Sequence, residues 1–166
     1  VVIADGAVTT TGQTFTLSTG IDIKTGTSAN DTFDGSVNAQ GTATLTSVDN
    51  LDGGDGTDTL IAEMAGGNIA PTVKHIESIE IIGSGIAPST FNVINVSDSP
   101  SILVRNSAQP VTVDSYAGNS ITLRDQQANL TVNQTNLAAT GATAFTVNLS
   151  GAQKGNINAS TNLFYY

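Results

Sequence analysis

The stretch Leu51-Asp52-Gly53-Gly54-Asp55-Gly56-Thr57-Asp58-Thr59-Leu60-Ile61 contains, over residues 53–61, the nonapeptide pattern G-G-x-G-x-D-x-U-x, in which U is an apolar residue. Its glycines permit backbone conformations and close approaches that a Cβ would forbid. The turn then exposes carbonyl oxygens and Asp58 adds a carboxylate, which are the hard oxygen ligands that Ca²⁺ prefers. Leu60 starts a short strand whose side chain is expected to point inward. The stretch therefore predicts a calcium-binding turn that leads into a β-strand.

A degenerate copy of the nonapeptide lies upstream, at Gly26-Thr27-Ser28-Ala29-Asn30-Asp31-Thr32-Phe33-Asp34. It keeps Asn30-Asp31 and then the apolar Phe33. Between the copies, Asp49-Asn50-Leu51-Asp52 adds further oxygen donors. In a regular nonapeptide roll neighbouring turns share each calcium ion, so one copy alone cannot complete a site. Two copies separated by an insertion predict one or a few calcium sites rather than a long roll.

A repeat of about ten residues follows over 81–135. Each block has a short apolar/polar alternation and then a turn rich in Asn, Asp, Ser, Gly or Pro, which is the pattern of a β-strand bounded by turns. A parallel β-helix or β-roll would place two or three such strands in each coil and stack their apolar side chains inside. An antiparallel β-sandwich would pair the same blocks as hairpins. The turns lack the Asn-Gly or Asp-Gly pairs of tight hairpins, so we expect an all-β parallel solenoid with calcium-binding turns.

The remaining segments are less regular. Strands are expected near residues 1–3, 14–17 and 144–149. Residues 42–45 are expected to form a strand or a loop excursion, and residues 73–81 a helical turn that leads into a strand.

The chain has 166 residues, enough for a sizeable core. We expect a calcium-binding segment over residues 1–65 and a β-solenoid segment over residues 66–166, packed as one continuous unit. The sequence has no cysteine, so metal ions and the core are the expected means of stabilisation. No apolar run is long enough to cross a bilayer. The abrupt ends suggest a piece of a longer polypeptide.

The chain is acidic. Fourteen Asp and Glu residues stand against five Lys and Arg residues, which gives a formal net charge of −9. Eight of the aspartates lie between Asp5 and Asp58 inclusive. Such a concentration of like charge repels itself unless cations neutralise it, which again favours calcium. There is no basic patch for phosphates, so nucleic acid is not an expected partner.

Three quoted stretches together resemble a known family: G-T-S-A-N-D-T-F at 26–33, L-T-S-V-D-N-L-D-G-G-D-G-T-D-T-L at 45–60, and I-E-S-I-E-I at 76–81. They are similar to the S-layer and related surface proteins of Gram-negative bacteria, which belong to the wider RTX group exported by type I secretion. The nonapeptide is more specific for the RTX group than for S-layer function, because RTX proteases, lipases, adhesins and toxins share it.

The resemblance implies a secreted, extracellular protein of the cell surface that folds when it meets calcium outside the cell. For an S-layer member, calcium would also drive assembly into a lattice. By that likeness Asp58 is the first ligand candidate. The others are the side chains and carbonyls of Asp31, Asp34, Asp52, Asp55, Asn30, Gly53, Gly54 and Gly56. The chain departs from the family pattern because it has one perfect nonapeptide and not a tandem array.

We expect no enzyme. His75 is the only histidine, which excludes the HExxH zinc signature, and there is no GxSxG nucleophile elbow.

The expected function is a structural S-layer segment that associates with itself or with neighbouring domains. One alternative is an RTX adhesin segment that binds glycans or host surfaces. A second is a calcium-dependent polysaccharide lyase or epimerase, for which the candidate residues are Arg105, Arg124, Asp114 and Asp125; a surface ion pair across coils is the competing interpretation of the arginines.

Overall fold

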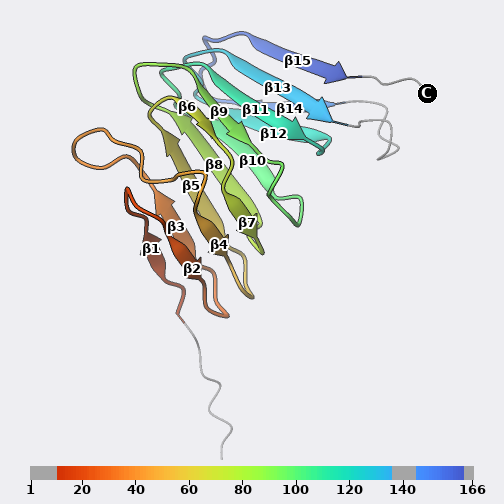
Figure 1. The fold of residues 1–166 in the computed structure, drawn as a ribbon. Coiled ribbons are helices and arrows are strands. Elements are labelled where there is room, and N and C mark those ends of the chain that lie inside the picture. Colours follow the sequence, from red (N-terminus) through yellow and green to blue (C-terminus); the bar gives the residue numbers. More distant parts are fainter. Residues whose placement is uncertain (1–10, 136–144, 163–166) are drawn as a thin grey trace, which may run out of the picture.

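The computed structural model describes residues 11–135 and 145–162, and these residues form an all-β parallel solenoid (Figure 1). The predicted solenoid is confirmed. All strand pairs in the described ranges are parallel, which excludes the antiparallel sandwich. Within this part of the chain no helix is long and apolar enough to span a membrane.

The first sheet runs the length of the solenoid and contains seven strands. Its register shows that the coils differ in length, since Thr14 pairs with Thr32, Thr32 with Thr59, and Thr59 with Ser78. Its strands, in spatial order, are β1 (Thr14–Thr16), β3 (Thr32–Gly35), β5 (Thr59–Met64), β8 (Ser78–Gly83), β10 (Ser101–Arg105), β12 (Ser120–Arg124) and β14 (Thr146–Ser150).

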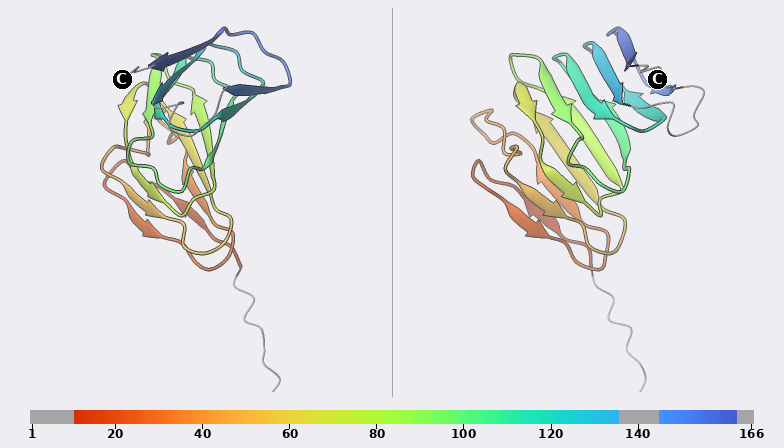
Figure 2. Two further views of the ribbon diagram at one scale, coloured as in Figure 1. Left: turned by 90° about the vertical axis from the view of Figure 1, so that its right-hand side faces the viewer. Right: turned by 45° about the vertical axis from the view of Figure 1, so that its right-hand side comes forward.

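The other two sheets each cover only part of that length. The second sheet contains β6 (Gly67–Ile69), β9 (Ser89–Asn92), β11 (Val111–Tyr116), β13 (Leu130–Thr135) and β15 (Ile157–Asn162). The third sheet contains β2 (Ile23–Thr25), β4 (Asn50–Asp52) and β7 (Thr72–Lys74). The coil that starts with β5 therefore has three sides, whereas the later coils have two. Figure 2 shows the stacked coils from two further directions.

The ten-residue repeat corresponds to half a coil. Successive blocks alternate between the first and second sheets, so β8, β10 and β12 stack on one side and β9, β11 and β13 on the other. The pairing of Leu103 with Thr122 and of Val111 with Leu130 shows that two blocks complete one coil. This is the arrangement that the solenoid prediction requires.

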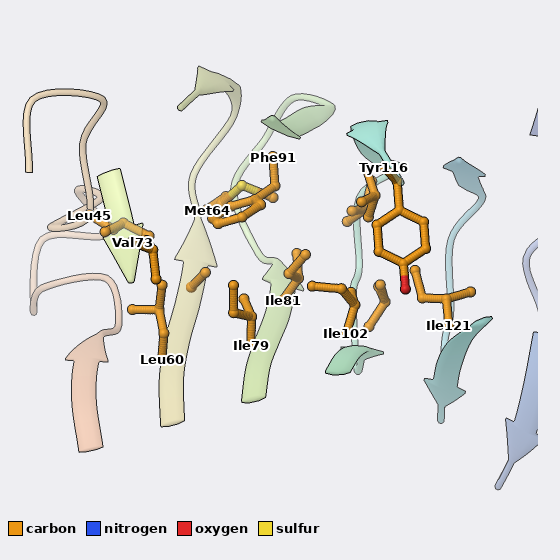
Figure 3. Close-up of a cluster of buried hydrophobic side chains, with 14 of the residues drawn as sticks. Leu45, Leu60, Met64, Val73, Ile79, Ile81, Phe91, Ile102, Tyr116 and Ile121 are labelled. Carbon is orange, nitrogen blue, oxygen red and sulfur yellow. The ribbon is translucent and has the colours of Figure 1, made fainter. Parts of the chain in front are cut away.

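The core is a column of apolar side chains along the solenoid axis. Alternate residues of each strand point inward, as in β5, where Leu60, Ala62 and Met64 are buried. Phe91 and Ile81 from the two sheets lie in the same core (Figure 3). Burying such a side chain is worth about 1.5–3 kcal/mol. Because the inward side chains of each coil rest on those of its neighbours, the coils stabilise one another.

Several smaller expectations can now be compared with the structure. The strand near 14–17 is confirmed as β1, and the strand near 144–149 as β14, which begins at Thr146. Residues 42–45 form a loop excursion in which Leu45 is buried in the core. The predicted helical turn in 73–81 is wrong, because β7, a turn at His75 (φ 49°) and β8 occupy this range. The strand expected at 1–3 lies outside the described residues.

Candidate functional site

The two nonapeptide copies lie directly on one another, at the corner where the third sheet turns into the first. One copy joins β2 to β3 and the other joins β4 to β5. Phe33 pairs in register with Leu60, so Asp31 and Asp58 occupy the same position in neighbouring coils. The Thr57 N–H donates to the Asn30 side-chain oxygen at 2.9 Å and further aligns the two turns.

A third acidic residue, Glu77, continues this line into the next coil. It precedes β8 as Asp58 precedes β5, and its Oε2 accepts a hydrogen bond of 2.7 Å from the Asp58 N–H. We refer to Asp31, Asp58 and Glu77 as the acidic column. Sequence reasoning missed Glu77 because no glycine turn precedes it. The available signal was its place before Ser78-Ile79, which is equivalent to that of Asp58 before Thr59-Leu60.

The carboxylate of Asp31 is fully used by hydrogen bonds to its own coil and the preceding one. Its Oδ1 accepts from the Gln13 N–H at 2.6 Å, and its Oδ2 accepts from the Thr27 N–H. The Thr27 hydroxyl is a further donor to Oδ1. Burial alone would raise the pKa of Asp31, but the hydrogen bonds from Thr27 and Gln13 outweigh it and lower the pKa. Asp31 is thus satisfied as an anion.

The carboxylate of Asp58 is only half used, although the side chain is completely buried. Its Oδ1 accepts from the Asp31 N–H at 2.6 Å, but its Oδ2 has no hydrogen-bond partner among the described residues. The difference from Asp31 lies in the turn. Gly54 takes the place of Thr27, has a φ of 89°, and donates its N–H to Asp52 instead.

The surroundings of Asp58 disfavour its negative charge. Burial raises its pKa, and the nearby charges of Asp31 and Glu77 raise it further, against the lowering effect of the Asp31 N–H. A buried polar group without a partner costs about 1–3 kcal/mol, and a charged one costs more. Among the described residues, this corner of the fold therefore holds a buried carboxylate oxygen without a hydrogen-bond donor, at a position where negative charge is disfavoured.

The chemistry of the corner fits a hard cation, although the side chains alone do not form a cage. In the described ranges, no three His, Asp or Glu side chains come together in an arrangement that could hold a metal ion. Calcium takes six to eight oxygen ligands, which include backbone carbonyls and water. The residues that would hold it are Asp58, through its free Oδ2, and Glu77, with backbone carbonyls of the two turns. Gly53 lies against Asp58 Oδ2 so closely that a Cβ would overlap it.

The other predicted ligands are held elsewhere. Asp52 pairs with Lys74 at 3.0 Å and with His75 at 2.7 Å. Asp34 accepts hydrogen bonds from the N–H and hydroxyl of Ser36. Asp55 and Gly56 lie at the exposed tip of the turn. The structure thus brings Asp31 and Asp58 together, with Gly53 beside them, and directs the side chains of Asp52 and Asp34 to other partners.

The contacts of Asp52 create a local pH dependence. Its hydrogen bonds with His75 and Lys74 lower the pKa of Asp52, and the same bond with Asp52 raises the pKa of His75. The contribution of His75 to stability is complete below its ordinary pKa of 6.5 and is lost as the pH rises through the raised value. That of Asp52 is complete above its ordinary 3.8 and is lost as the pH falls through the lowered value. The pair therefore stabilises most between pH 3.8 and 6.5. His75 is exposed to solvent and Asp52 is half-buried, so solvent screens the pair and its effect on stability is small.

The residues considered for a lyase do not converge. Arg105 and Arg124 are register partners on the first sheet, as their spacing suggested, and Arg105 forms an ion pair with Glu80 at 2.6 Å. Asp114 lies on β11 in the second sheet, where Asn92 and Asn133 donate to it. Asp125 accepts a hydrogen bond from the Ala152 N–H. The ion pair of Arg105 joins neighbouring coils, as the competing interpretation of the arginines expects. The hydrogen bonds of Asp114 and Asp125 likewise join one coil to the next.

Comparison with protein-family models, with curated proteins and with solved structures finds no match for this chain.

Proposed function

We propose that this chain is a structural, non-enzymatic segment of a secreted cell-surface protein of the S-layer type, and that calcium bound at the acidic column couples to its folding. One observation carries the proposal: in the part of the chain that the structure describes, the completely buried Asp58 has a carboxylate oxygen without a hydrogen-bond partner, and Asp58 belongs to the copy that matches the calcium nonapeptide in full. In the degenerate copy, backbone donors satisfy the equivalent Asp31.

Calcium would resolve the electrostatic cost of this corner. Three acidic side chains follow one another across three coils, and the charges of its two neighbours raise the pKa of the middle one. A bound divalent cation supplies compensating positive charge and accepts oxygen ligands without a proton. Where calcium is scarce, as inside a cell, the charges of Asp31, Asp58 and Glu77 oppose the stacking of these coils. Folding would then follow export.

A structural role fits the architecture of the described segment. In the described ranges its hydrogen-bonded sheets are open at their ends, because β1 pairs only with β3 and β2 only with β4. Open ends of a solenoid expose backbone donors and acceptors that neighbouring domains or further copies can continue. Self-association or packing against neighbouring domains of a longer polypeptide is therefore the expected mode of action.

The test is thermal unfolding and sedimentation in millimolar Ca²⁺, in millimolar Mg²⁺ and with a chelator. Calcium at about 100 times its dissociation constant stabilises by about 2.7 kcal/mol. For a chain of this length that corresponds to a Tm increase of about 5–10 °C. We expect this increase with Ca²⁺ and a much smaller one with Mg²⁺.

Two matched variants locate the effect. Asp58→Asn keeps the acceptor for the Asp31 N–H but removes the anionic oxygen, and we expect it to abolish the calcium-dependent increase in Tm. Asp125→Asn makes the same change at a residue that also accepts a backbone N–H, far along the solenoid, and should leave the increase intact. Equal Tm values of the wild type in calcium and in chelator would refute the calcium proposal.

The sedimentation experiment distinguishes the S-layer function from the adhesin function. Ordered assemblies that grow on addition of calcium support the S-layer function. A calcium-stabilised protein that stays monomeric favours the adhesin segment instead.

A further inference from the structure

A cavity of about 370 Å³ lies at the corner where β11 turns into β12, and one of its lining residues, Ser101, bonds to the Glu77 carbonyl. Its inner wall consists of the buried side chains Ile102, Tyr116 and Ile121 and the half-buried Val93 and Val96. Figure 3 shows the Tyr116 ring beside Ile102 and Ile121. This volume is within the range of small-molecule sites in proteins, about 300–1,000 Å³.

The cavity arises where the cross-section of the solenoid changes. The third sheet ends near Val96, which makes a single bridge to Val73 of β7. In that coil residues 93–100 connect the second sheet to the first, whereas in the next coil residues 117–119 suffice between β11 and β12. Val93 and Val96 of the longer connection are half-buried and line the cavity together with residues 115–122 of the next coil.

Three residues in or beside the cavity wall have a left-handed backbone conformation. Asp98, Ser99 and Ser115 have φ values of 65°, 50° and 60°, and Ser99 and Ser115 line the cavity. Each non-glycine residue in this region costs on the order of 1–3 kcal/mol, and such residues cluster at ligand clamps. The Tyr116 hydroxyl donates to the Ser120 carbonyl, which restrains the ring, and burial raises the pKa of the phenol.

The lining carries no charge, although the chain as a whole is strongly acidic. Within the described residues, no Asp, Glu, Lys, Arg or His contributes to the wall. The rim instead offers hydroxyl and amide groups of Ser99, Ser101, Asn119 and Thr122. A charged ligand would lose its hydration here and find no counter-ion, whereas a neutral one would bury apolar area and keep hydrogen bonds.

We infer that this cavity binds a neutral ring compound whose hydrocarbon face packs on Val96, Ile102 and Tyr116 and whose hydroxyl groups contact the rim serines and Asn119. A pyranose unit of a glycan and a phenol share this chemistry. The inference stands apart from the calcium proposal, because the cavity and the acidic column have no residue in common.

The experiment is a titration followed by methyl and aromatic NMR shifts, with three probes: phenyl β-D-glucopyranoside, methyl β-D-glucopyranoside and phenol. We expect at least one probe to shift the methyl signals of Val93, Val96 and Ile102 and the ring signals of Tyr116, with a dissociation constant at or below the millimolar range. Binding of the methyl glycoside but not phenol assigns a sugar ring; the reverse assigns an aromatic ring.

Three variants decide whether the binding belongs to the cavity. Ala117→Trp and Ser101→Trp add bulk from two different lining residues and should weaken binding at least tenfold. Ala108→Trp makes the same change at an alanine outside the lining and should leave binding unchanged. The inference is overturned if no probe shifts these signals, or if both cavity variants bind as the wild type does.

Discussion

Replacing Gly53 with alanine tests how closely neighbouring coils stack at the acidic corner. A Cβ on Gly53 would lie 2.8 Å from the carbonyl carbon of His75 and closer still to its oxygen, although real Cβ contacts essentially never fall below 3.0 Å. Gly53 has no positive φ, so this overlap is the main consequence of the change. Gly41 offers the opposite case, with a φ of 74° and no atom within 4 Å of the added Cβ.

The two substitutions differ in expected cost. To admit a Cβ at Gly53 the coils must separate, which breaks the 3.0 Å hydrogen bond from its N–H to the Lys74 carbonyl. An unpaired buried donor costs about 1–3 kcal/mol. Loosening the contact of Leu51 with Val73 adds to this, and we expect a total of about 3–5 kcal/mol. At Gly41, left-handed strain of about 1–2 kcal/mol is offset by about 0.4–1 kcal/mol of lost unfolded-state entropy.

The assay is thermal and urea unfolding followed by circular dichroism, with calcium and with a chelator. At about 2–4 °C per kcal/mol, Gly53→Ala should lower the Tm by about 6–20 °C and Gly41→Ala by a few degrees. We expect a difference under both conditions, because the overlap with the His75 backbone does not depend on an ion, and a larger one in calcium, because the added Cβ also overlaps Asp58 Oδ2. A loss at Gly53 no larger than that at Gly41 would show that these coils do not stack in the described register.

Two further predictions rest on other contacts. In an NMR titration His75 should have a pKa above 6.5, because it bonds to Asp52, and Asp52→Asn should return it to its ordinary value; an unchanged pKa in the variant would contradict this contact. Ser107→Ala should cost about 1–3 kcal/mol in urea unfolding, because the buried Gly83 N–H loses its acceptor. Ser101→Ala removes the exposed hydroxyl that donates to the Glu77 carbonyl, and it should cost less because water can replace that hydroxyl. Equal losses of unfolding free energy in the two variants would refute the role of Ser107 as a buried acceptor.

Much of the fold could be predicted because local pattern and long-range pairing agree. The ten-residue spacing that begins at Ile81 places alternate blocks in opposite sheets, and each block keeps its apolar residues on the inward side. The alignment of Asp31 with Asp58 was also visible, since the two copies keep the same spacing to Phe33 and Leu60. In a solenoid, sequence-equivalent positions become spatial neighbours, so these inferences carry over directly.

Other features could not be predicted because they depend on which coil lies next to which. The buried residues Val73, Ile76 and Ile79 are spaced as on a helix, but Val73 belongs to β7, Ile79 to β8, and Ile76 to the turn between these strands. The loop that buries Leu45 takes the place of a second-sheet strand, and nothing in its polar, Thr-rich sequence indicates this. Glu77 became part of the acidic column only through a short coil, from Thr59 to Ser78, whose final turn lacks the nonapeptide.

The distribution of charge along the solenoid follows from how each coil satisfies its corner N–H groups. In the amino-terminal coils, carboxylates accept them, as Asp49 does from Asp22 and Asp58 does from Asp31. In the later coils buried neutral side chains have the same role, since Ser107 accepts from Gly83 and Gln126 accepts from Ser107, whereas Asp125, a carboxylate that also accepts a backbone N–H there, is only half-buried. The same backbone requirement is met in both halves, so hydrogen bonding alone does not explain why the early coils use charged acceptors.

A neutral acceptor stabilises its neighbour without electrostatic cost, whereas a stack of carboxylates adds repulsion that a cation can relieve. The excess charge at Asp58 is therefore explained if an ion is part of the folded state. The neutral ladder of Ser107 and Gln126 would then fold without calcium, and the dependence on the ion would be confined to the coils that carry the nonapeptides.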